Sequence, residues 1–304
     1  MSLAQVEATT EVAKVGEEGG SLRKDAWRRL RRDPVAIVGF ALIAFFVLVA
    51  IFAPWIAPYG PAERPGAGIV TPTNIPGPSA EFWFGLDELG RDEFSRVVFG
   101  ARTSLLVGVV ALLLGMAGGL LLGILAGAFG GKVDTVIMRV VDVMLSIPGL
   151  LMAIAIAALL GRSLLSVMIA IAVINIPIFA RLLRGQMLAQ RGSDYVLAAT
   201  SLGVRRRSIV LGHVLPNSMS PVIVQATLTL ATAIIEAAGL SFLGLGSPDP
   251  RVPEWGLMLA NTQRYLASAP HLAFFPGVAI VIAALGFTLL GERLREALDP
   301  KYRR

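Results

Sequence analysis

The sequence has no cysteine and only two histidines among its 304 residues. Disulfide bonds, thiolate catalysis and cysteine-ligated metal sites are therefore excluded. Charged side chains are also scarce, at 16% of the residues, whereas a soluble domain carries about 25%. With 55% hydrophobic residues and a mean hydropathy of +0.71, the chain has too few polar side chains to cover a water-soluble globule. We therefore expect an integral membrane protein.

Long stretches without charge recur along the chain, and a transmembrane helix needs roughly 20 apolar residues. The sequence therefore predicts an all-α membrane protein with six transmembrane helices. The third and fourth runs are short and are joined by a tight turn at 161–163, so they could form one helical hairpin. Pro148 and Pro177 are expected to kink these two spans. The six candidate spans are 34–58, 102–132, 142–162, 162–181, 217–246 and 271–292.

The distribution of basic residues predicts the orientation of these spans. The segments 1–33, 132–139, 181–207 and 293–304 hold 20 of the 27 Lys and Arg residues. Loops rich in Lys and Arg stay in the cytoplasm, so both termini are expected there. The net charge of +6 then reflects a cytoplasmic membrane surface and not a nucleic-acid partner.

This orientation divides the chain into five parts. Residues 59–81, in the outer loop, are rich in proline and glycine without periodicity, which predicts irregular structure. They either contact a partner or span a distance, and we favour the second interpretation. The five parts are a cytoplasmic N-terminal tail (1–33), a first transmembrane helix (34–58), an extracytoplasmic loop with an amphipathic segment (59–101), a five-helix core (102–292) and a cytoplasmic C-terminal tail (293–304).

A run of glycines in the second span predicts close helix packing. Glycines four residues apart share one face of a helix and let a second helix approach closely. We expect a helix–helix contact here and assign no chemistry to it. The series consists of Gly115, Gly119, Gly123, Gly127 and Gly131.

The mixed-charge segment DELGRDEFSR (87–96) allows two interpretations. It is either a proton relay or an amphipathic helix on the outer membrane surface, with Phe94, Val97 and Val98 facing the lipid. We favour the surface helix, because the charges lie outside the apolar interval.

Glu236 is the one acid deep in a span, where ionisable groups are costly. It is either a residue of a transport pathway, which would meet an ammonium group of a ligand, or a structural hydrogen-bonding group. Ser241 and Phe242, which follow on the same span, are grouped with it as candidate pathway residues.

The stretch SDYVLAATSLGVRRRSIVLGHVLP (193–216) interrupts the apolar runs on the expected cytoplasmic side. Ser193 can cap a first short helix, and Gly203 suits its C-terminus. A second short helix can begin at about Arg206, and Pro216 is expected to end it. Two short helices joined at a glycine form an angled elbow that can dock a partner. The expected apolar faces comprise Tyr195, Ala198, Ala199 and Leu202 on the first helix, and Ile209, Val210 and Val214 on the second.

Part of this elbow resembles the coupling loop of permease subunits in bacterial ABC importers, through Ala198, Ala199, Gly203, Leu215 and Pro216. Leu197 and His213 replace the usual Glu and Ile, and His213 is similar to the peptide-importer branch. The stretches FGLDELGRDEFSRVVFGARTSL (84–105) and LSFLGLGSPDPRVPEWGLML (240–259) resemble the dipeptide, oligopeptide and nickel branch, with DppC- and OppC-like subunits. The resemblance runs from about position 23 to the C-terminus.

The resemblance implies the fold of a type I ABC importer permease in a bacterial plasma membrane. The chain would form half of a translocation pathway for dipeptides or oligopeptides, beside a second, similar permease subunit. Two cytoplasmic ABC ATPase subunits would bind the elbow, and an extracytoplasmic binding protein would deliver the ligand. The coupling residues that it implies are Ala198, Ala199, Gly203, Arg205, Arg206, Arg207, His213, Leu215 and Pro216.

The chain lacks the G-x-x-x-x-G-K-[ST] phosphate loop of ATP-binding subunits, which agrees with this division of labour. We therefore expect no enzyme activity, no metal and no cofactor on this chain, with ATP and Mg on the partner ATPases. His213 and His271 are expected on opposite sides of the membrane, so they cannot share a metal. The ligand stays open among dipeptides, longer peptides, metal chelates and haem-like molecules.

Two other classes of protein are compatible with a membrane chain of this composition. A stand-alone secondary transporter would need its own coupling site, for which Glu236 is the one candidate, and inverted repeats, which the sequence does not display. An intramembrane enzyme would need paired catalytic groups within reach of one another. Neither class requires partner ATPases, so ATP dependence distinguishes both from an ABC importer subunit.

Overall fold

The computed structural model describes residues 27–71 and 74–298. Within these ranges the chain is a bundle of helices, and its β-pairing is limited to two isolated bridges in the loop before α4. Most of the expected N-terminal tail and residues 299–304 lie outside the described residues. The elements are α3 (Pro34–Ile56), α4 (Glu93–Phe129), α5 (Gly131–Ser146), α6 (Gly149–Leu160), α7 (Leu164–Arg191), α8 (Asp194–Ser201), α9 (Arg206–Ile209), the π-helical turn η1 (Val210–Val214), α10 (Leu215–Phe242), α11 (Trp255–Thr262) and α12 (His271–Leu298).

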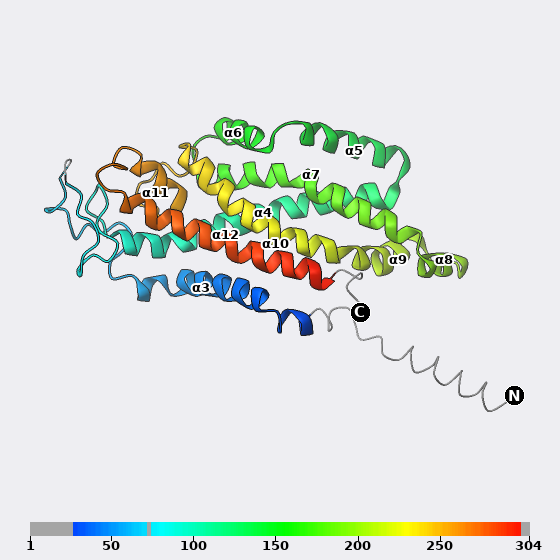
Figure 1. The fold of residues 1–304 in the computed structure, drawn as a ribbon. Helices are drawn as coiled ribbons and strands as arrows, with labels where there is room; N and C mark the ends of the chain where they lie inside the picture. Colours follow the sequence, from blue (N-terminus) through cyan, green and yellow to red (C-terminus); the bar gives the residue numbers. More distant parts are fainter. Residues whose placement is uncertain (1–26, 72–73, 299–304) are drawn as a thin grey trace, which may run out of the picture.

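Five long helices, α3, α4, α7, α10 and α12, run side by side along the bundle (Figure 1). Each is long and apolar enough to cross a membrane, with α10 counted together with α9 and η1. A sixth crossing is obtained when α5 and α6, which meet at an angle of 93°, are counted as one broken span. The predicted all-α fold with six spans is therefore confirmed on that count. α8 and α9 lie at the same end as the start of α3 and the end of α12, and α11 lies at the opposite end (Figure 1).

The third span differs from its predicted bounds, 142–162. The chain breaks at Ile147 and Pro148, so that α6 has only 12 residues. Proline lacks the N–H that a helix requires and restricts the preceding residue to extended backbone. Ile147 accordingly adopts φ −88° and ψ 131°. The bend expected at Pro148 is thus a complete break, whereas α7 continues without interruption through Pro177.

The predicted glycine face of α4 packs against α7. A Cβ atom at Gly119 would lie 2.5 Å from the Cβ atom of Phe179, so only a glycine permits this approach. Gly131 does not continue the face, because Gly130 and Gly131 both have positive φ and separate α4 from α5. Within the predicted series, an added Cβ would come within 3.0 Å of an α7 atom at Gly115, Gly119, Gly123 and Gly127, and the neighbouring Gly118 meets Ile176 of α7 at 3.0 Å as well.

The favoured surface helix at 87–96 is wrong. α4 begins at Glu93, and the charged residues around its start are buried inside the protein. Asp87 and Arg91 are each 2% exposed, and the Arg91 Nε atom lies 2.5 Å from Oδ2 of Asp87. Nε of the equally buried Arg96 lies 3.4 Å from the same oxygen. Opposite charges that pair in this way can be buried, because each replaces the water that the other would need.

α5 is attached to α7 by two ion pairs. Nη2 of Arg184 lies 2.6 Å from Oδ2 of Asp134, and Arg181 pairs with Asp142. Both α5 and α6 expose most of their apolar side chains, and they lie on the opposite side of the bundle from α3 (Figure 1). The buried residues of α5 and α6 are Val141, Ala153 and Ala157.

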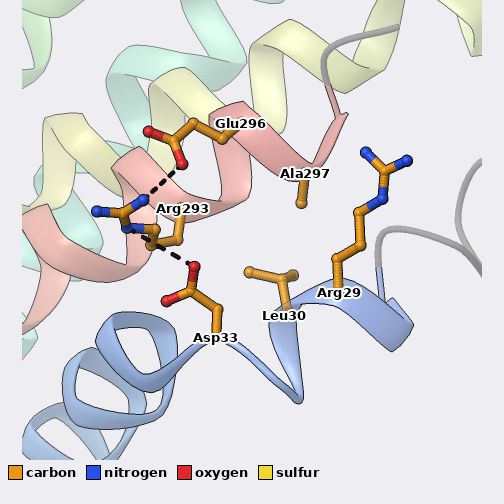
Figure 2. Close-up of a pocket in the computed structure, with 6 residues that line it drawn as sticks. All are labelled: Arg29, Leu30, Asp33, Arg293, Glu296 and Ala297. Atoms are coloured by element: carbon orange, nitrogen blue, oxygen red, sulfur yellow. Dashed lines mark hydrogen bonds and ion pairs between the residues drawn. The ribbon is translucent and has the colours of Figure 1, made fainter. Parts of the chain in front are cut away.

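α3 is fixed to the last span at the end of the bundle that holds α8 and α9. The Asp33 carboxylate caps α3 by accepting hydrogen bonds from the N–H groups of Val35 and Ala36. The same carboxylate lies 3.9 Å from Nε of Arg293 on α12. Figure 2 shows the Arg293 guanidinium between the carboxylates of Asp33 and Glu296, beside a cavity of about 180 Å³.

Candidate functional site

The elbow at 193–216 consists of short helices joined at a glycine, as predicted. α8 ends in a Schellman motif, in which the N–H of Val204 donates to the carbonyl oxygen of Ala199 at 3.1 Å and the N–H of Gly203 donates to that of Thr200 at 3.0 Å. Gly203 has φ +71°, a conformation that other residues rarely adopt. A Cβ atom added at Gly203 would meet nothing within 4 Å. Glycine is therefore favoured here by the backbone conformation and not by a lack of room for a side chain.

One side of the elbow is anchored in the core of the bundle. Val196 of α8 is buried, and so are Ile209, Val210 and Val214 of the second helix. These four residues belong to the same apolar cluster as the side chains of α4, α7 and α10. The predicted apolar face of the second helix is therefore covered by the chain itself and is not free for a partner.

The other side of the elbow is apolar and exposed. Leu202 is 83% exposed, and Tyr195 and Leu197 are exposed as well. Of the two adjacent alanines, Ala198 is exposed and Ala199 is half-buried against the core. An exposed apolar patch of this kind, rimmed by polar groups, is typical of a protein-interaction surface.

The second helix does not end at Pro216, contrary to the prediction. α9 passes into η1 and then directly into α10. The N–H of Leu215 donates to the carbonyl oxygen of Val210, five residues back, which is a π-helical bond. Pro216 thus occupies the first turn of α10, where its missing N–H is tolerated. The elbow and α10 form one continuous element.

The arginines of the elbow differ in their surroundings. Nη2 of Arg206 donates to the carbonyl oxygens of Ala128 at 2.7 Å and Phe129 at 3.2 Å, at the end of α4. Arg191, at the end of α7, donates to the same Ala128 oxygen at 2.6 Å. These bonds satisfy carbonyl groups that have no partner within the helix, and the positive charges suit the negative end of its dipole. The remaining exposed arginines are Arg205 and Arg207.

The two histidines lie at opposite ends of the bundle. The exposed His213 belongs to η1, and its carbonyl oxygen accepts a hydrogen bond from Nδ2 of Asn217 at 2.9 Å. His271 begins α12, with Nε2 lying 3.3 Å from the carbonyl oxygen of Leu86. Among the described residues, no group of three or more His, Cys, Asp or Glu side chains is placed to hold a metal ion.

A polar stripe runs along α10, formed by Gln225, Thr229, Thr232 and Glu236. Their spacing of four, three and four residues puts them on one helix face. Nε2 of Gln225 donates to Oγ1 of Thr229 at 3.1 Å. Glu236 is half-buried, and its Oε2 atom is buried without a hydrogen-bond partner among the described residues. Sequence reasoning singles out only Glu236, although the spacing could have revealed the other three.

The two ends of α10 differ in character. Near the end remote from the elbow, Phe242 is exposed, whereas Ser241 is fully buried beside Gly246. Near the elbow, a cavity of about 450 Å³ opens between α7, α10 and α12. The polar stripe therefore leads from the part of α10 remote from the elbow to a cavity with a partly polar lining. The polar residues of that lining are Gln186, Ser220, Gln225 and Arg295.

The stretches 84–105 and 240–259 interlock at the end of the bundle opposite the elbow, and we call this contact the outer latch. Nη1 of Arg91 donates to the carbonyl oxygen of Pro250 at 2.5 Å, and Nη2 of Arg96 reaches the same oxygen at 3.4 Å. Beside these two arginines, burial raises the pKa of Glu88 above its usual value. The nearby carboxylate of Asp87 raises this pKa further.

Trp255 and Glu254 extend the outer latch. Trp255 is fully buried, and its Nε1 atom donates to the carbonyl oxygen of Val97 at 3.0 Å while its backbone N–H donates to Oγ of Ser104 at 3.1 Å. Glu254 caps α11 by accepting hydrogen bonds from the two N–H groups that follow Trp255, at 2.9 Å each. Burial raises the pKa of Glu254, and these hydrogen bonds partly oppose the shift.

A bundle of this topology, with an exposed elbow between two spans, agrees with the membrane subunit of an ABC importer. Residues 119–304 match the family described as binding-protein-dependent transport system inner membrane component. Residues 21–71 match the N-terminal transmembrane domain of oligopeptide transport permease C. The chain belongs to the family of inner membrane components of binding-protein-dependent transport systems. It is a multi-pass protein of the bacterial inner membrane and a transport subunit, not an enzyme.

Curated relatives cover nearly the whole chain. It is 46% identical over 279 residues to the dipeptide transport system permease protein DppC of Alkalihalophilus pseudofirmus, covering 91% of this chain and 90% of the relative. This chain is also 46% identical over 276 residues to the glutathione transport system permease protein GsiD of Escherichia coli O6:K15:H31. The match covers 90% of this chain and 89% of the relative. These likenesses confirm the recognised family and give the stand-alone secondary transporter no support.

Among solved structures, an inward facing MetNI methionine ABC transporter matches with a TM-score of 0.55 at 20% identity. The match covers 67% of this chain and 96% of the other. This likeness concerns the fold alone, and it confirms the predicted ABC importer permease fold.

Proposed function

We propose that this chain forms one half of the translocation pathway of an ATP-driven peptide importer, beside a second, similar permease subunit. Relatives named as permeases for dipeptides and for glutathione support small peptides as the cargo. In this proposal an extracytoplasmic binding protein delivers the peptide. Two cytoplasmic ATPase subunits bind ATP and Mg²⁺ and drive the cycle from the elbow.

The elbow is the observation that carries this proposal. Its exposed apolar side, around Leu202, offers the kind of surface that a soluble partner covers. Because η1 joins α9 to α10 without a break, displacement of the elbow is transmitted to α10. The bonds of Arg206 to the last carbonyl groups of α4 transmit it to that helix as well. Closure of the ATPases would therefore move two spans at once.

The polar stripe of α10 lines the pathway in this proposal. A carboxylate within a span is costly unless it faces water, a cavity or a partner, and Oε2 of Glu236 has no partner among the described residues. A free peptide carries an α-ammonium group, which is a suitable counter-charge. The peptide would enter near Phe242, pass Glu236 and Thr232, and leave through the cavity beside Gln225.

In this arrangement the elbow and both termini face the cytoplasm, and the outer latch faces the binding protein. The absence of native cysteine makes the orientation testable by labelling. A cysteine at the exposed Ser79, in the outer loop, should react with an impermeant maleimide in intact cells. A cysteine at the exposed Ser201, in the elbow, should react only after the membrane is permeabilised. The reverse pattern would overturn the orientation.

The function itself is tested by purifying the tagged chain from its native membrane in mild detergent. We expect a second permease and ATP-binding subunits in the eluate by mass spectrometry, with vanadate-sensitive ATP hydrolysis. Reconstituted with its binding protein, the complex should take up dipeptides only when ATP is supplied. A chain that purifies alone and inactive in several detergents would contradict the proposal. A complete complex that hydrolyses ATP but does not take up peptides would contradict only the proposed cargo.

A further inference from the structure

A groove of about 450 Å³ lies at the elbow end of α4, away from the exposed side of α8. Its walls include Ile124 and Phe129 of α4 and Leu211 of η1, and Arg206 and Arg207 of α9 also line it. The groove thus combines apolar walls with two guanidinium groups.

The groove and its immediate surroundings carry several positive charges. Arg191 and Arg206 both direct a guanidinium group at the carbonyl oxygen of Ala128, so two like charges lie close together. Arg207, which follows Arg206, is exposed. In the part of the chain that the structure describes, none of these three arginines forms an ion pair. The carbonyl groups at the end of α4 carry only about half a negative charge, so the groove attracts an anion.

The groove continues into an exposed apolar face along α4. Leu106, Leu113 and Leu121 are 54%, 51% and 59% exposed. At helical spacing they lie on the same side as Ile124, which lines the groove, and opposite Gly115 and Gly119, which pack on α7. This face extends over roughly 27 Å from Leu106 to Ile124, close to the thickness of a bilayer core.

We propose that the groove binds an anionic phospholipid from the cytoplasmic leaflet. Its phosphate lies against Arg207 and Arg206, and an acyl chain lies along the part of the exposed α4 face nearest the elbow, since one leaflet is about half of the bilayer core, roughly 15 Å thick. Guanidinium groups bind phosphate oxygens through paired, charge-assisted hydrogen bonds. A protein partner would have to supply both an acidic group and a long apolar surface, whereas one phospholipid has both. Bound there, the lipid holds the end of α4 against the elbow.

The test compares lipid binding by two arginine variants that differ only in their position relative to the groove. The tagged chain, purified with the subunits that accompany it, is titrated with phosphatidylglycerol or phosphatidylcholine and examined by native mass spectrometry. We expect tighter binding of phosphatidylglycerol, weakened about fivefold by Arg207→Gln, as for the loss of one arginine beside a membrane. Arg205→Gln removes the same charge from an exposed neighbour that does not line the groove, and it should leave the affinity unchanged.

Equal phosphatidylglycerol affinity in the two variants would overturn the proposal. A second measurement asks whether protein covers the apolar face instead. In the cysteine-free chain, a Leu121→Cys variant carrying a photoreactive maleimide should cross-link to lipid in native membranes and not to a neighbouring subunit. Efficient cross-linking to a second permease would overturn the lipid assignment. Neither readout requires transport, so the outcome is independent of the proposed cargo.

Discussion

Replacing Gly203 by valine tests whether the elbow transmits movement from the ATPases. Gly203 has φ +71°, and the position of its Cβ atom is open. The new side chain therefore meets no neighbour, and the perturbation is confined to the backbone. A left-handed conformation costs an ordinary residue about 1–2 kcal/mol, and a β-branched residue is a poorer fit still. Asparagine tolerates this conformation better and provides a matched control.

A local cost of this size lowers the population of the glycine-ended elbow by a factor of roughly 5–30. We expect ATP-driven peptide uptake by the reconstituted complex to fall by about that factor in Gly203→Val and much less in Gly203→Asn. The amount of chain in the membrane should be the same for both variants, because no core contact is lost. If the valine variant transports as well as the asparagine variant at equal membrane levels, the elbow geometry does not control transport and the reasoning fails.

Three further substitutions test the pathway, the helix packing and the outer latch. Glu236→Gln keeps the shape but removes the charge, and uptake of radiolabelled dipeptide should fall about tenfold; unchanged uptake would remove this residue from the pathway. Gly119→Ala places a methyl group 2.5 Å from an α7 side chain, so thermal unfolding in detergent should show a loss of about 1–3 kcal/mol. Gly185→Ala, at a helical glycine with open space, should cause no loss, and the reverse order would contradict the packing. Arg91→Met removes the nearer partner of the buried Asp87 carboxylate and leaves it only Arg96, at 3.4 Å, so unfolding should show a loss that approaches the value of about 3–5 kcal/mol for a broken buried pair. Arg251→Gln at an exposed pair should leave unfolding unchanged, and equal unfolding temperatures would count against a structural role for the latch.

The features that the sequence predicts correctly are local ones. α3, α4, α7, α10 and α12 each overlap a predicted apolar interval over most of its length, because a helix that crosses lipid needs an apolar surface whatever it packs against. The packing face formed by Gly115, Gly119, Gly123 and Gly127 of α4 is also predicted correctly, because it depends only on the spacing of these glycines along the helix. The prediction that α8 ends at Gly203 is correct, because a helix often ends in a residue with left-handed backbone conformation and glycine adopts that conformation most readily.

The features that it does not predict depend on distant contacts or on rare backbone geometry. The charges at 87–96 favour a surface helix when considered alone. They are buried because Asp87 and the carbonyl oxygen of Pro250, far along the chain, together surround Arg91 and Arg96. The continuation of the elbow into α10 depends on the π-helical turn η1, which allows Pro216 to follow without a break. Neither arrangement leaves a periodic signal in the sequence.

α4 is held at both ends by other parts of the chain. Near the elbow, Arg206 binds its last carbonyl groups. At the outer latch, Trp255 binds the carbonyl oxygen of Val97. The glycine face fixes the same helix to α7 along its length. A push on the elbow should therefore move α4, α7 and α10 as one body, and relative motion has to occur elsewhere.

The broken pair α5 and α6 lies on the outside of that body and exposes most of its apolar side chains. It breaks at Pro148, and the Arg181–Asp142 pair that attaches α5 to α7 is half exposed, so it contributes at most about 1 kcal/mol. We expect α5 to shift against α7 during transport. A cross-linker with two maleimides and a reducible disulfide in its spacer, joined to cysteines placed at these two positions, should then block uptake, with activity restored by reductant. Full uptake by the cross-linked protein would show instead that α5 and α7 move together, and the flexible boundary would have to lie between the two permease subunits.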